Sequence, residues 1–367
     1  FFEETTAMKN YPVLKTLLMA LTVFGFCQSS QASVPFQSHW LGSRVWIGPE
    51  YWANPLQDWR MDEGQVVALA AHDRTLHQLT HQVTETMGDF EMEVQLRLDG
   101  AVTGKFSQSF VGGFRFGIRG ELDEYRHALV SAVEWMDAGI RGDGKVILGK
   151  DVSGEVLDPT QWISLRLRAT FDGVNASVRL IAQEVNGSRS STLEVKVLSD
   201  QLKGNLALLA NGASRTPDRA GTSWRFRDWS MAGPSLSNDP SQSFGPILWS
   251  QYTLSRGTVK LAALMAPVEV SSEPVRLELK QSERWVEAGT SDVDPLSRTA
   301  LFRIEDWDDS KEVPYRLVYT WEGTDHTWSG LIRKDPRDNH LFTMGAFSCD
   351  NGYIFPNATI VKNVAIQ

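Results

Sequence analysis

Short runs in which apolar and polar residues alternate fill most of the chain between residues 33 and 232. The longest cover 90–98 and 162–171, and shorter ones recur at 176–182, 193–198 and 224–231. A period of two is typical of strands with one buried face and one wet face. Clusters of Gly, Asp and Asn, such as Asp172-Gly173, separate the runs. The pattern therefore predicts an all-β sandwich or jelly roll.

A second β region is expected from residue 246 to residue 335, after a linker rich in Pro, Ser and Gly at 233–245. Six or seven strand-like runs fit into about 90 residues there, of which 298–304 and 315–321 alternate most regularly. This length and strand number predict an immunoglobulin-like or fibronectin-like sandwich. The whole chain is thus expected to be mainly β and multi-domain.

The pattern changes again at residues 336–367. Residues 340–348 are almost continuously apolar, which favours a strand buried on both faces inside an α/β layer. After a loop, Asn357 could cap a helix with Ile360 and Val361 on one face. One strand, loop and helix cannot form a domain alone, so we expect the protein to continue past Gln367, or this segment to pack on another part.

The N-terminal residues have the order of a secretory signal peptide. Lys9 and Lys15 precede the apolar run 17–27, and the small residues Ser30 and Ala32 follow it. The apolar run is too short for a permanent membrane span. We therefore predict a signal peptide at 8–32 with cleavage near Ala32-Ser33, no permanent membrane anchor, and a periplasmic, cell-surface or extracellular protein. A buried core helix is the alternative.

Composition narrows the choice of partner. The 367 residues carry a net charge of −9, which argues against nucleic acid as a ligand because nucleic-acid binders present a basic face. The 13 tryptophans could stack on sugars or fill sandwich cores. Four of them are the candidates for glycan stacking, with core packing as the alternative: Trp46, Trp52, Trp59 and Trp135.

Metal-ligating residues occur in two places. Cys349 follows the apolar strand of residues 340–348, where an open α/β sheet binds ligands, and Asp350 and Asn351 are next to it. Thiolate and carboxylate groups are both metal ligands. His72, His77 and His81 form a second group, for which solvated or capping roles are the alternative to metal binding.

The C-terminal segment, with Ser348-Cys349 at its strand end, resembles the first catalytic segment of PhoD-like alkaline phosphatases, a branch of the calcineurin-like metallophosphoesterases. The resemblance implies that Cys349 is a ligand of the active-site metal, with Asp350 and Asn351 as further candidates. It implies a metal pair in the parent enzyme, iron with Ca, Zn or Mn, and a phosphoester substrate. The other ligands of such a site would come from segments beyond Gln367.

The two β regions carry resemblances of their own. Residues 298–304, 315–321 and 328–333 look like the end of the fibronectin-like domain that precedes such catalytic domains. Residues 224–231 resemble the last strand of a concanavalin-type, laminin-G-like sandwich. These resemblances imply a domain order of concanavalin-like sandwich, fibronectin-like sandwich and the start of a metallophosphoesterase domain.

Two functions from different classes follow, and a third ranks last. The first is the N-terminal part of a secreted metal-dependent phosphatase or phosphodiesterase, inactive here because most of its two-metal site is missing. The second is a secreted, lectin-like protein that binds polysaccharide through residues 33–232 and has no catalysis of its own. The third makes that sandwich a glycosidase, which needs two paired carboxylates among residues such as Glu134 and Asp137.

Overall fold

The computed structural model describes residues 35–100, 104–214, 221–269, 273–341, 356–357 and 360–363. These residues are mainly β-strand, with one short α-helix, α1 (Tyr125–Val130), in the first half. No helix in the part of the chain that is described has the length and apolar character needed to cross a membrane.

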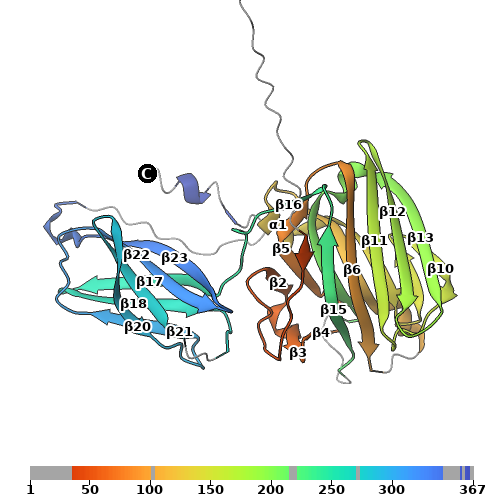
Figure 1. Ribbon diagram of the computed structural model, residues 1–367. Coiled ribbons are helices and arrows are strands. Elements are labelled where there is room, and N and C mark those ends of the chain that lie inside the picture. The colour runs from red at the N-terminus through yellow and green to blue at the C-terminus, as the bar shows by residue number, and fades with distance from the viewer. Residues whose placement is uncertain are drawn as a thin grey trace, which may run out of the picture. The chain divides into compact units, whose positions relative to one another are not determined.

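The first half is a sandwich of two antiparallel sheets (Figure 1). Sheet A has the order β13-β12-β11-β6-β15-β4-β3, and β1 pairs with β15. Its strands are β1 (Phe36–Gln37), β3 (Trp59–Asp62), β4 (Gln65–Leu69), β6 (Met87–Asp99), β11 (Ile163–Asp172), β12 (Asn175–Glu184), β13 (Ser190–Leu198) and β15 (Ser223–Ala232).

Sheet B has the order β10-β9-β8-β7-β14-β5-β16, and β2 pairs with β5. Its strands are β2 (Tyr51–Asn54), β5 (Thr75–Val83), β7 (Val111–Gly120), β8 (Ala132–Arg141), β9 (Lys145–Leu148), β10 (Asp151–Val156), β14 (Gly204–Asn211) and β16 (Leu236–Asn238). The short strand β16 lies inside the segment expected to be a linker and extends sheet B by pairing with β5.

One hydrophobic core lies between sheets A and B. Along β6, every second residue from Phe90 to Leu98 is buried, as the alternation predicts. Large side chains of both sheets fill this core, among them Phe114 and Phe116 from sheet B and Trp224 and Phe226 from sheet A. The burial of so much aromatic surface is the main stabilising contribution to such a sandwich.

The pair Gly112-Gly113 is typical of a turn in the sequence, and the structure shows that it does not form one. Both glycines lie inside β7, in the middle of sheet B. A Cβ on Gly112 would overlap the ring of Trp224, and one on Gly113 would overlap the backbone of β8 at Ala138. Glycine is therefore required here because neighbouring groups occupy the space of a side chain. The sequence alone does not distinguish this use of glycine from its use in a turn.

Residues 247–332 form two further antiparallel sheets. A three-stranded sheet has the order β17-β18-β21 and a four-stranded sheet the order β20-β19-β22-β23. One core cluster joins them, with Leu261, Leu277 and Leu317 almost fully buried. The strands are β17 (Ile247–Ser255), β18 (Thr258–Met265), β19 (Val275–Gln281), β20 (Arg284–Ser291), β21 (Thr299–Ile304), β22 (Val313–Trp321) and β23 (Thr324–Ile332). The strand runs expected here are thus present, while the fibronectin-like assignment stays a prediction.

Several predictions concern residues outside the described part. The signal peptide at 8–32 and the candidate ligands Cys349, Asp350 and Asn351 all lie there. Of the expected C-terminal helix, residues 360–363 are helical, and the Asn357 carbonyl accepts a hydrogen bond from the Val361 amide at 3.0 Å.

Candidate functional site

A row of ionisable side chains crosses the outer face of sheet B, the face that points away from the shared core. The strand register places His77 of β5 opposite Ala207 of β14, Ala207 opposite Arg115 of β7, and Arg115 opposite Asp137 of β8. The core-facing neighbours Leu76 and Phe114 point to the other side, because side chains alternate along a strand. The sheet therefore fixes the spacing of these groups.

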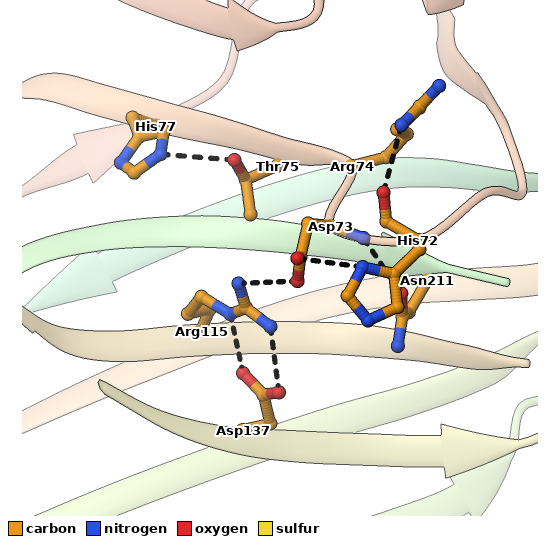
Figure 2. Close-up of polar contacts among 8 residues, drawn as sticks. All are labelled: His72, Asp73, Arg74, Thr75, His77, Arg115, Asp137 and Asn211. Atoms are coloured by element: carbon orange, nitrogen blue, oxygen red, sulfur yellow. Dashed lines mark hydrogen bonds and ion pairs between the residues drawn. The ribbon is translucent and has the colours of Figure 1, made fainter. Parts of the chain in front are cut away.

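Arg115 is the centre of the row. Its guanidinium makes two hydrogen bonds to the carboxylate of Asp137, at 2.7 and 3.0 Å, and one to Asp73 at 3.3 Å (Figure 2). The side chain is 9% exposed. Burial alone would lower the pKa of Arg115, but the hydrogen bonds and charges of Asp137 and Asp73 outweigh it and raise that pKa above its usual value. The guanidinium is therefore charged and held in one orientation.

Asp73 comes from the loop between β4 and β5 and has a left-handed backbone with φ of 59°. The amide side chain of Asn211 accepts a hydrogen bond from the Asp73 backbone amide at 2.9 Å, which fixes the loop to the end of β14. The other oxygen of the Asp73 carboxylate lies 2.8 Å from Nδ1 of His72. Both His72 and Asp73 are about half exposed, so this edge of the row is open to solvent.

Trp135 of β8 completes the site as an exposed aromatic surface. The guanidinium of Arg115 lies over its ring, 4.6 Å from the centroid. Trp135 is nevertheless 44% exposed. A cation–π contact of this kind orients the indole, and the remaining ring surface is free to contact a ligand.

His77 lies at the closed end of the row. Its Nε2 is 3.1 Å from the hydroxyl of Thr75, and its Nδ1 is buried without a hydrogen-bond partner among the described residues. Burial, and then the positive charge of Arg115, lower the pKa of His77 to about 3. The imidazole is therefore neutral at any physiological pH.

The three histidines do not form a metal site. His72 is exposed, His77 lies beside Arg115, and His81 packs on Phe36 with ring centroids 5.6 Å apart. Solvated or capping roles are also wrong for His77 and His81, which are 3% and 4% exposed. Within the described ranges, no group of three His, Cys, Asp or Glu residues could hold a metal ion.

The four tryptophans proposed for glycan stacking differ in their exposure to solvent. Trp46 and Trp59 are 1% and 2% exposed, so their rings cannot contact a sugar and this prediction is wrong for them. Trp52 is half-buried and meets Phe244 edge to face at 4.7 Å. Only Trp135 of the four presents an exposed ring beside fixed polar groups.

Sequence reasoning missed Arg115, Asp73 and Asn211, which lie on separate strands and loops. Asp137 and Glu134 were considered as glycosidase carboxylates, and each is bound by an arginine instead, Asp137 by Arg115 and Glu134 by Arg119. A polar residue inside the almost continuously apolar run of β7 was the one signal for Arg115.

Comparisons with known proteins give matches among solved structures only. No protein-family model and no curated protein matches the chain. A basic winged bean lectin with Tn-antigen is 9% identical, with a TM-score of 0.41, over 55% of this chain and 98% of the lectin. A winged bean acidic lectin complexed with methyl-α-D-galactose is 8% identical, with a TM-score of 0.42, over 56% and 99%. The carbohydrate recognition domain of Emp47p is 9% identical, with a TM-score of 0.29, over 52% and 93%.

Proposed function

We propose that the first sandwich binds a saccharide on the outer face of sheet B. The observation that carries this proposal is the exposed ring of Trp135 beside a buried guanidinium held by two carboxylates. Aromatic rings contact the apolar faces of sugars, while fixed polar groups bind their hydroxyls directionally. Asp73 and His72, both half exposed, supply an acceptor and a ring nitrogen next to this surface.

The charges of the site favour a saccharide without acidic groups. Arg115 is the cation that lies over the ring of Trp135, and Asp137 and Asp73 already bind it. The two carboxylates carry more charge than the one guanidinium, so the site is negative. An anionic sugar would be repelled. Hydrogen bonds from hydroxyls to a charged carboxylate are each worth about 1.5–3 kcal/mol, enough for specific recognition.

The direct test is a glycan array followed by titration calorimetry with Trp135→Ala. We expect at least a tenfold loss of affinity, equivalent to about 1.4 kcal/mol, because the ring contact is lost. Trp249→Ala is the matched control, since Trp249 is 42% exposed, against 44% for Trp135, and lies on β17, outside the first sandwich. Equal affinities for the two variants, or no retention of any glycan, would overturn the proposal.

The phosphoesterase prediction concerns other residues and stays a prediction from the sequence. Cys349, Asp350 and Asn351 lie outside the described residues, so no contact of theirs supports it. Reading the coding sequence after Gln367 tests it. A stop codon there would remove it, whereas later segments rich in Asp, Asn and His would supply the missing ligands.

A further inference from the structure

A cleft of about 750 Å³ opens at one end of sheet B. The ends of β5, β14, β7 and β8 line it, together with the segment 121–125 that leads into α1. It is distinct from the row around Arg115, since neither Arg115 nor Asp137 lines it. A cleft of this size is in the range of small-ligand sites.

The wall formed by α1 is fixed to the sheet. Ala128 of α1 packs with Ile118 and Ala207 of the outer face in a small apolar cluster. The side-chain amide of Asn205 donates a hydrogen bond to the carbonyl of Tyr125 at 2.9 Å. Asn205 is 2% exposed, and this partly buried contact holds α1 against the sheet.

Arg119, near the end of β7, lines the cleft next to β8. Its guanidinium bonds to Asp200 at 2.9 Å and to Glu134, and its Nε is buried without a partner in the described part of the chain. The hydrogen bond that Arg119 donates to Asp200, more than the one it donates to Glu134, raises the pKa of Arg119 above its usual value. Arg119 is thus a second guanidinium paired with two carboxylates on the same strand as Arg115.

The cleft ends next to Trp135 in the chain order of β8. Val133 and Glu134 line the cleft, and Trp135 follows them directly on β8. Val133 and Trp135 are exposed, at 53% and 44%. Arg115 and Arg119 are four residues apart on β7, which corresponds to roughly 13 Å along a strand. A monosaccharide cannot span that distance, whereas an oligosaccharide can.

We infer that the ligand is an oligosaccharide without acidic groups, which runs from Trp135 along β8 into this cleft. This inference rests on the proposed function of the first sandwich and extends it. Five acidic residues line the cleft against two basic ones: Glu121, Asp123, Glu124, Glu134 and Asp200 against Arg119 and Lys203. A chain of uronic or sulfated sugars would be repelled there as well as at Trp135.

A bound metal ion is the competing occupant of an acidic cleft, but the geometry does not support it. The carboxylates are spread along the cleft, and within the described residues no three of them come together as ligands. Exposed apolar groups, Leu122 and Val133, lie between them. Apolar surface next to acceptor oxygens matches the two kinds of surface of a sugar chain.

The test is a chain-length series. Disaccharides, tetrasaccharides and hexasaccharides of the cello-, laminari-, manno- and chito- series are titrated into the full chain, with hexagalacturonate as the acidic probe. We expect affinity to rise at least tenfold from disaccharide to hexasaccharide in the series that binds, and no binding of hexagalacturonate. Arg119→Ala and, separately, Val133→Ala should remove most of this gain and leave the disaccharide affinity unchanged.

Arg303→Ala is the matched control, because Arg303 of β21 is also an arginine paired with a carboxylate, that of Glu305, away from the cleft. Saccharide binding that does not depend on chain length would overturn this inference and leave the proposed function standing. Tighter binding of hexagalacturonate would overturn the charge assignment. No binding at any length, in any series, would overturn the proposed function and this inference together.

Discussion

The outer faces of sheets A and B carry the same kind of ion pair in opposite surroundings. On sheet A, Arg166 and Glu93 lie 2.8 Å apart and are 52% and 33% exposed. On sheet B, Arg115 and Asp137 lie 2.7 Å apart and are 9% and 25% exposed. The chemistry and the distance are alike, so the difference between the two pairs lies in their access to water.

Access to water decides what each pair can do. A solvated pair such as Arg166–Glu93 adds little stability and does not fix its side chains, because water screens the charges and competes for the hydrogen bonds. Water has little access to the buried pair on sheet B and does not compete for its hydrogen bonds. The pair therefore holds Arg115 against Trp135 in one geometry. The pair Arg166–Glu93 on sheet A is therefore solvated, and the pair Arg115–Asp137 on sheet B is pre-organised.

The largest expected effect comes from removing the carboxylate on sheet B. Among the described residues, Asp137→Ala leaves the buried guanidinium with the longer carboxylate contact to Asp73, and we expect a loss of about 3 kcal/mol in the free energy of unfolding. Denaturant unfolding monitored by tryptophan fluorescence measures it. Saccharide affinity should fall in the same variant, because Trp135 loses its fixed neighbour.

Asp137→Asn is the accompanying variant, because it keeps the size of the side chain and one hydrogen-bond acceptor. It should recover part of the stability lost in Asp137→Ala. If Asp137→Ala unfolds at the denaturant concentration of the unmodified protein, the contrast between the two sheets is wrong.

A smaller effect is expected from the buried histidine of sheet B. The pKa of His77 is about 3 in the folded protein, against about 6.5 when unfolded, so the unfolded chain binds more protons between these values. The stability from keeping His77 neutral is present above pH 6.5 and is lost as the pH falls toward 3. From pH 6.5 to 5.5 this loss is about 1 kcal/mol.

His77→Gln should remove that part of the pH dependence, so its unfolding free energy should fall less than that of the unmodified protein over the same interval. His72→Gln is the control, because His72 is half exposed on the same edge of the site. Equal pH dependence in the His77 variant and the unmodified protein would contradict a buried, neutral His77.

The same two sheets explain how much the sequence could predict. The strands of sheet A were found because β6 and β11 bury every second residue against one core and leave the others in water. In β7 of sheet B the first eight residues are all buried, so apolar and polar residues do not alternate along it. Its two adjacent glycines, Gly112 and Gly113, are typical of a turn in the sequence. The site could not be predicted for a related reason. Arg115 and Asp137 meet through strand pairing, and Asp73 reaches Arg115 from a loop.

The smallest expected effect belongs to the ion pair on sheet A and completes the contrast. Glu93→Ala removes the partner of an exposed arginine, and Arg166 keeps a second carboxylate, that of Glu91, at 3.3 Å. We expect a change of less than about 0.5 kcal/mol in the free energy of unfolding and no change in saccharide affinity. The same unfolding and titration experiments as for Asp137→Ala measure both. A loss of stability similar to that of Asp137→Ala would mean that burial does not distinguish the two pairs. A loss of affinity in Glu93→Ala would move the saccharide to the outer face of sheet A.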